Sequence, residues 1–154
     1  MKETERISKL FADLYNGSPW IGVVIVPTLK KLTAKQAARR IYKDWNTIWE
    51  ITNHLISWRE NVLRRVQGDV IKSPSHNYVQ PVKDTSDLAW QQTMQRLEDS
   101  QNAWLSFLKK FKTSDFENIY PNNHMTYYEH LHGILQHDAY HLGQIVLLSK
   151  RVRK

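Results

Sequence analysis

His137 and His141 are the two residues whose type and spacing most directly suggest metal chemistry. In a helix, four positions at about 100° per residue place the two imidazoles within roughly 40° of each other and one turn apart. Two ring nitrogens in that arrangement can point at one cation, and zinc and nickel are divalent metals that accept imidazole ligands well. The spacing therefore predicts part of a divalent-metal site, because two protein ligands alone do not make a tight one.

The pair is expected near the buried face of its helix. On a helical wheel, Ile134, Ile145 and Leu148 fall within roughly 40° of His141. A polar group buried there without a partner costs about 1–3 kcal/mol on mutational scales, and a shared cation would satisfy both rings at once. The same spacing also occurs among histidines that simply pack in a core, so by itself it does not establish a metal site.

A third ligand has to come from elsewhere in the chain, and His54 is the candidate. It lies at the edge of an apolar arc in an earlier helical segment, beside Trp58. Glu50 precedes it by one turn on the same side and is the candidate catalytic residue, as a general base or as a partner of the ligand ring. Two alternatives stay open. Glu50 also fits a plain surface acid, and His130, on the same side of its helix as His141, could replace a ligand or simply pack.

Composition excludes several other kinds of chemistry. The chain of 154 residues has no cysteine, so disulfides, thiolate metal sites, iron–sulfur clusters and cysteine nucleophiles are impossible. Its length argues for a single domain over residues 1–154, and 41% hydrophobic residues supply a real core. The longest apolar run, 20–26, is too short to span a bilayer, and the first residues lack a signal-peptide pattern. A soluble protein of the reducing cytoplasm, without a membrane partner, is expected.

The net charge of +7 invites a nucleic-acid interpretation, because lysine and arginine neutralise phosphates. The basic residues are spread along the chain, often as pairs, and such pairs are typical of solvated helix surfaces. No recognition helix, aromatic RNA-binding motif or zinc finger accompanies them. Nucleic acid is therefore not an expected partner. The pairs are Lys30–Lys31, Arg39–Arg40, Arg64–Arg65 and Lys109–Lys110.

Apolar periodicity predicts four long helices, over about 2–16, 33–66, 86–111 and 126–150. The second and fourth begin at sequences with capping-box spacing, Thr33 with Gln36 and Thr126 with Glu129. Between the second and third helices, residues 69–85 predict a long connection, because they contain two prolines and many polar residues. Four helices with one long central connection indicate an all-α four-helix bundle.

Shorter segments and the tryptophans complete this prediction. Residues 18–32 are expected to form a loop or a short helix, and residues 112–125 an irregular connection. Tryptophans are large apolar side chains, so most of them are expected in the core or between helices. These are Trp45, Trp49, Trp58, Trp90 and Trp104.

Three segments of the chain, in order, resemble the DinB-like family of damage-inducible four-helix bundles. The family's closing motif, a Gly followed by H-D-x-Y-H-x-G-Q-I, is similar to LHGILQHDAYHLGQIVLLSK at 131–150. Its second helix, with a W-E-x-x-x-H-x-x-x-W pattern, is similar to WNTIWEITNHLISWRENVLRR at 45–65. Its usual lead-in resembles SPWIG at 18–22 followed by LTAKQAARR at 32–40. The resemblance thus extends over nearly the whole chain.

Members of that family bind a divalent metal through three histidines, one from the second helix and two from the last. Carried over to this sequence, the resemblance implies that His54, His137 and His141 are the ligands, the same three that the helical geometry suggests. It also implies up-down-down-up connectivity, with the long crossover between helices 2 and 3, and a homodimer. One departure is Leu142, where a small residue is common in the family.

The resemblance further implies a divalent metal cofactor and a small-molecule substrate, and the imidazole ligands favour zinc or nickel as that metal. Three neutral imidazoles leave at least one coordination position open, as in catalytic sites. The implied reactions are metal-dependent hydrolysis or transfer of a low-molecular-weight thiol to an electrophile. In either, Glu50 or Asp138 could orient a ligand ring or take a proton, and Tyr140 and Gln144 could line the pocket. The alternative is a non-catalytic metal-binding stress-response protein that acts through its dimer surface.

Overall fold

The computed structural model describes residues 1–154 and contains helices, turns and no β-strand, which confirms the all-α prediction. No helix has both the length and the apolar composition that a membrane span needs. A single turn of 3-10 helix covers Thr113–Asp115. The helices are α1 (Glu3–Asn16), α2 (Ile25–Lys30), α3 (Ala34–Ala37), α4 (Ile48–Val66), α5 (Asp87–Lys110) and α6 (Tyr127–Val152).

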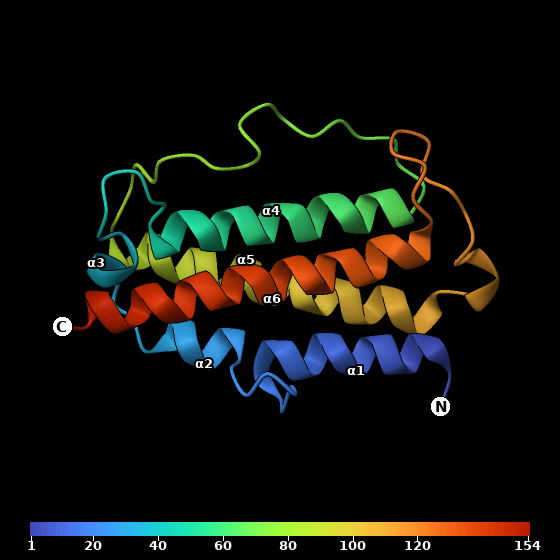
Figure 1. Ribbon diagram of the computed structural model, residues 1–154, viewed down its shortest axis with the longest axis horizontal. Helices are drawn as coiled ribbons and strands as arrows, with labels where there is room; N and C mark the ends of the chain where they lie inside the picture. Colours follow the sequence, from blue (N-terminus) through green and yellow to red (C-terminus); the bar gives the residue numbers. More distant parts are fainter.

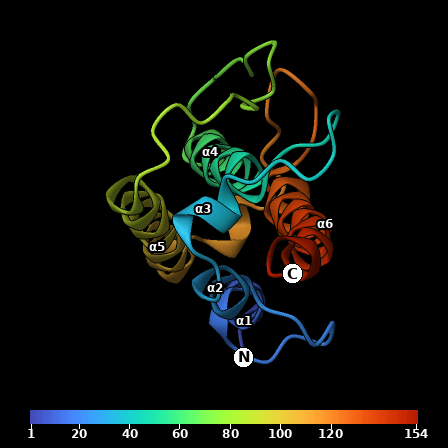
Figure 2. The ribbon, with the colours of Figure 1, turned by 90° about the vertical axis from the view of Figure 1, so that its left-hand side faces the viewer.

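The long helices lie side by side along the molecule (Figure 1). Viewed end-on, α4 lies between α5 and α6, while α1 and α2 lie on the far side of the same two helices (Figure 2). In Figure 1, α1 and α6 run toward the left and α4 and α5 run toward the right. The chain must therefore travel back along the molecule between α4 and α5, and residues 67–86 make that return. This is the long connection that the sequence predicts at 69–85.

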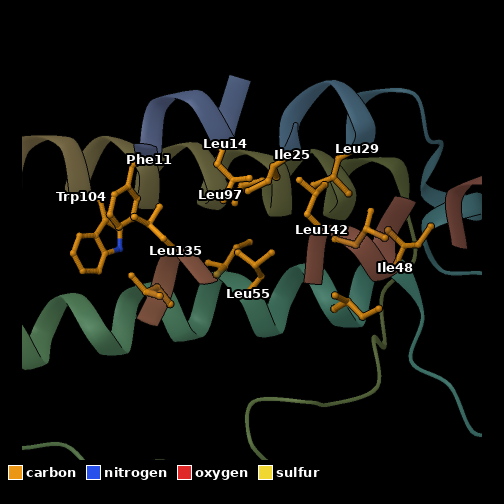
Figure 3. Packing of buried hydrophobic residues seen from close by; sticks show 14 of the residues in the cluster. Phe11, Leu14, Ile25, Leu29, Ile48, Leu55, Leu97, Trp104, Leu135 and Leu142 are labelled. Atoms are coloured by element: carbon orange, nitrogen blue, oxygen red, sulfur yellow. The ribbon is translucent and has the colours of Figure 1, made fainter. Parts of the chain in front are cut away.

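The core is one cluster of 27 buried hydrophobic residues drawn from all the long helices. Figure 3 shows Leu14, Leu55, Leu97 and Leu142 pointing into the space between their helices. Burying a side chain of this size contributes roughly 1.5–3 kcal/mol to folding. The long helices are therefore packed together by apolar side chains, and we expect them to stay folded without a metal.

Most helix boundaries agree with the sequence prediction to within two residues, but a single helix over 33–66 is wrong. The capping box predicted at the start of that stretch is present, yet the helix it opens ends at Ala37. A second capping box, in which the Thr47 side chain accepts from the Glu50 N–H, starts a new helix at Ile48. Residues 38–47 therefore form turns between two competing helix starts.

This break also explains the one tryptophan whose predicted environment is wrong. Trp49, Trp90 and Trp104 are buried, as expected. Trp45 is 54% exposed, because it lies in the turns that precede α4 rather than inside a helix that faces the core. Trp58 is half-buried and borders the histidine cavity described below.

Candidate metal centre

The three histidines predicted as ligands meet in a cavity beside α4 and α6. One nitrogen from each of His54, His137 and His141 lies within 4.8 Å of the other two. The Nε2 atoms of His54 and His137 are 3.0 Å apart. Two nitrogens bound at about 2.0–2.1 Å to one cation, at roughly 90–110° to each other, are about 2.9–3.4 Å apart. The separation fits a shared ion, so this trio could hold a metal.

Apolar packing turns these histidines toward the cavity. Leu55, the residue after His54, is 1% exposed, and Leu142, the residue after His141, is fully buried. Adjacent residues on a helix point about 100° apart, so a leucine fixed in the core places its neighbour at the edge of the core. Leu142, the departure from the family pattern, therefore contributes to the core between the helices and leaves the ligands free.

Hydrogen bonds fix which nitrogen two of the rings offer. The His54 Nδ1 lies 2.6 Å from the Asn77 carbonyl oxygen, and the His141 Nδ1 lies 2.7 Å from the Gln144 Oε1. Carbonyl oxygens only accept, so both Nδ1 atoms carry the proton and both Nε2 atoms carry a lone pair, which in His54 faces the Nε2 of His137. Partners of this kind hold metal-binding imidazoles in the correct tautomer and orientation.

Burial keeps two of the rings neutral. It lowers the pKa of His54 from 6.5 to about 4, although the hydrogen bond to the Asn77 carbonyl acts in the opposite direction. Burial also lowers the pKa of His141, against a hydrogen bond to Gln144 that raises it. A metal binds only the unprotonated ring, so both residues are ready to act as ligands at neutral pH.

The metal-free protein is expected to lose stability as the pH falls from about 6.5 toward 4. The pKa of His54 is about 4 in the folded chain against 6.5 for an ordinary histidine. Between these two values a proton binds His54 in the unfolded chain but not in the folded chain, so proton binding stabilises the unfolded state as the pH falls. The size of the effect is set by the difference between these two pKa values and saturates once the pH lies below both. Urea unfolding of the wild type and of His54→Gln, each at pH 7, 6 and 5, measures it. The variant should show a shallower pH dependence, and equal dependence in both proteins would refute this explanation.

Asp138 lies behind the trio in a buried ion pair. Its Oδ2 is 2.7 Å from the Nη1 of Arg59, and both side chains are almost wholly buried. The Arg59 guanidinium also donates to the side chain of Gln101. The second carboxylate oxygen, Oδ1, has no hydrogen-bond partner and lies 3.8 Å from the Nδ1 of His137, an atom that is likewise buried and unpartnered. The carboxylate is thus adjacent to a ligand ring, but this separation is too long for a direct hydrogen bond.

The structure does not bring Glu50 into the cavity. One carboxylate oxygen pairs with Arg40 at 2.6 Å, and the other accepts the Thr47 N–H at 2.7 Å. Glu50 is 4% exposed, so the interpretation as a plain surface acid is wrong. Its catalytic role stays a prediction, and both oxygens already have partners that stabilise the start of α4.

His130 lines the same cavity but does not belong to the trio. Its Nδ1 lies 2.9 Å from the Thr126 carbonyl oxygen, and its Nε2 lies 3.3 Å from the amide nitrogen of Asn123. With both nitrogens occupied and the ring 5% exposed, His130 packs at the start of α6. The sequence leaves open whether His130 replaces a ligand or simply packs, and the structure favours packing.

The cavity has a volume of about 620 Å³, and Tyr140 and Gln144 line it, as the sequence predicts. Among the lining residues that were not identified from the sequence, Asn77 and Arg65 matter most for the chemistry of the site. Asn77 reaches the site from the connection between α4 and α5, in a left-handed conformation with φ of 51°. Asn77 contributes a backbone carbonyl, which a pattern of side chains cannot predict. The residue type is consistent with the conformation, because asparagine tolerates left-handed backbone angles well.

Arg65 is the second missed residue, and its predicted solvated environment is wrong. The sequence groups it with Arg64 as an exposed pair, but Arg65 is only 8% exposed and lines the cavity. A helical wheel contains the signal, because Arg65 follows Trp58 by seven positions and Val62 by three, which places it on their face of α4.

Comparison with protein families matches residues 24–145 to the DinB superfamily. The matched range contains most of the chain and all three histidines of the trio. Neither the curated proteins nor the solved structures gave a match. Because the family match spans well over half of the sequence, the chain belongs to the DinB superfamily.

Proposed function

We propose that this protein is an enzyme that uses a divalent metal, zinc or nickel, to act on a small molecule. The reaction is either hydrolysis or the transfer of a low-molecular-weight thiol to an electrophile. One observation carries the proposal: three imidazoles converge on one point at the wall of a cavity of about 620 Å³. Cavities of this size accommodate small-molecule ligands.

The residues present fit such an ion. His54, His137 and His141 would hold it, and three protein ligands leave room for a fourth. A divalent ion there would lower the pKa of a bound water or thiol and so supply a nucleophile at neutral pH. The Asn77 carbonyl and Gln144 fix the rings of His54 and His141, which preorganises the donor set.

We also infer that the long helices form the up-down-down-up bundle implied by the family resemblance. The directions of the helices in Figure 1 and the return segment 67–86 support this connectivity. A cytoplasmic location is proposed on the absence of cysteine, which suits a reducing compartment.

The enzymatic proposal is tested with protein loaded with zinc or nickel. Two assays cover the two reactions: conjugation of cysteine or glutathione to chlorodinitrobenzene, and hydrolysis of p-nitrophenyl esters. The wild type should turn over substrate in one of the two assays. The rate in that assay should fall at least roughly 100-fold on chelation and in His141→Ala, because the reaction needs the metal in its site. His132→Ala is the matched control, since it removes an imidazole from α6 outside the cavity and should retain the rate. A rate that survives chelation unchanged would exclude metal-dependent catalysis.

A second candidate function is a non-catalytic metal-binding protein that acts through a homodimer surface. Exposed apolar side chains favour it: Tyr140 is 65% exposed and Leu147 is 62% exposed, seven positions apart on one face of α6. Trp45, 54% exposed, borders the same surface hollow as Leu147. Light scattering that gives the mass of two chains, together with no turnover in either assay, would favour this candidate.

A further inference from the structure

Arg65 is a buried cation without an acidic partner. It is 8% exposed, and no carboxylate of the chain forms an ion pair with it. Its guanidinium makes one hydrogen bond to the protein, from Nη2 to the Ser73 hydroxyl at 2.8 Å, and its Nε is buried without a partner. A guanidinium carries five N–H donors and stays charged at any pH of interest, so most of its donors are unused.

Aromatic rings contact the guanidinium but do not replace a counter-ion. Its carbon lies 5.3 Å from the ring centre of Trp58 and 4.9 Å from that of Tyr120. Such contacts stabilise a cation by less than its removal from water destabilises it. The other buried arginine of α4, Arg59, pairs with Asp138 at 2.7 Å. The chain therefore supplies a buried anion for one of these arginines and leaves the other unpaired.

Arg65 and the histidine trio line the same cavity, and Trp58 lies close to both Arg65 and His137. The Trp58 ring centre is 6.1 Å from that of His137 and 5.3 Å from the guanidinium carbon of Arg65. Glu129 is the one acidic side chain on the cavity wall, and its carboxylate caps the start of α6 by accepting the Thr126 N–H at 2.7 Å. A cavity with a buried cation at one end and a divalent ion at the other would strongly favour an anion.

We propose that Arg65 binds a carboxylate of the substrate while the reacting end of the same molecule lies at the histidine trio. This inference rests on the proposed function, since it takes the trio as the reacting end. A carboxylate is planar and matches two N–H groups of the guanidinium fork, so one arginine suffices to bind it. The substrate class is a small carboxylic acid, and the Trp58 side chain forms an apolar part of the cavity wall close to both Arg65 and His137.

The test uses benzoate as the probe and benzamide as its neutral counterpart. Nitrogen-15-labelled protein, with and without zinc, is titrated with each compound, and the amide and arginine Nε–H signals are followed by NMR. Benzoate should shift the signals of residues around Arg65 in both forms of the wild type, and benzamide should bind at least tenfold more weakly. Arg65→Met should weaken benzoate binding at least tenfold, and Arg65→Lys should weaken it less, because a point charge remains without the planar fork. Arg64→Met is the matched control, with the same change of charge one position away on the exposed face, and should bind as the wild type does.

Thermal unfolding separates ligand binding from a structural role of Arg65. If its unpaired charge serves binding, Arg65→Met should melt at the same temperature as the wild type or higher, because a buried charge without a partner is removed. A lower melting temperature together with unchanged benzoate affinity would overturn the inference.

The remaining outcomes distinguish this inference from the proposed function. Benzoate binding that requires zinc and is equal in Arg65→Met would place the anion at the metal, which overturns the role of Arg65 and leaves the proposed function standing. Arg65-dependent binding in a protein that takes up no metal would support the anion site and remove the proposed function. Tighter binding of inorganic phosphate than of benzoate at Arg65 would overturn the assignment to carboxylic acids.

Discussion

Replacement of His137 or His141 with Ala is expected to abolish stoichiometric metal binding. Each change removes one of three nitrogens that converge on a single point, and two remaining imidazoles from different helices make a poor site. Loss of a partner that merely supports a ligand already weakens metal sites by about 10–100-fold, so loss of a ligand should cost at least roughly 100-fold. Elemental analysis of natively purified protein should give one metal per chain in the wild type and almost none in either variant.

The matched control for this experiment is His132→Ala. It removes a histidine from the same helix outside the cavity and should leave one metal per chain. Far-UV circular dichroism should remain helical in both ligand variants and in the chelated wild type, because the hydrophobic cluster contains no histidine. One-to-one metal in both ligand variants would refute the assignment, and a large loss of ellipticity on chelation would make the metal structural.

Helix geometry proposes the trio as candidates, and the resemblance to the DinB-like family implies that these candidates are the ligands. The interval between His137 and His141 fixes their relative orientation within α6, and the apolar arc around His54 fixes its side of α4. What brings the two helices together is the burial of leucines next to the ligands, such as Leu55 and Leu142. Periodicity detects those positions, so the ligand set can be predicted before the fold is known.

Two features could not be predicted in the same way, because one depends on competition between two helix starts and the other on the path of the backbone in a connection. The start of α4 at Ile48 results from a second capping box that interrupts a stretch with continuous apolar periodicity. The Asn77 carbonyl reaches His54 because the connection between α4 and α5 folds back over α4, and its path is not encoded by periodicity. Arg65 is a different case, because helix periodicity does place it on the same face of α4 as Trp58. It was predicted to be exposed because charged residues usually are, and that general rule is wrong for this residue.

The largest effect on stability is expected from Arg59→Met. The change leaves the carboxylate of Asp138 buried with no cation, and breaking a buried pair by removing one partner typically costs about 3–5 kcal/mol. It also leaves the side-chain oxygen of Gln101 without its donor. Urea unfolding followed by circular dichroism should show this loss as a lower midpoint. Arg64→Met is the control, because its pair with Asp69 lies on the exposed surface and should contribute no more than about 1 kcal/mol.

A double variant, Arg59→Met with Asp138→Leu, shows whether the loss comes from the charge left behind. Replacing both partners by apolar side chains of similar size removes the unpaired carboxylate, so the double variant should be more stable than Arg59→Met alone. The same carboxylate lies 3.8 Å from the Nδ1 of His137, so Asp138→Leu should also weaken metal affinity, by up to about 10–100-fold, because it removes a negative charge from behind the ligand ring. A double variant as unstable as Arg59→Met would mean that the loss comes from the missing contacts of Arg59 and not from the unpaired carboxylate, and unchanged metal affinity would mean that Asp138 does not position His137. In that case His137 is oriented by the packing of α6 alone.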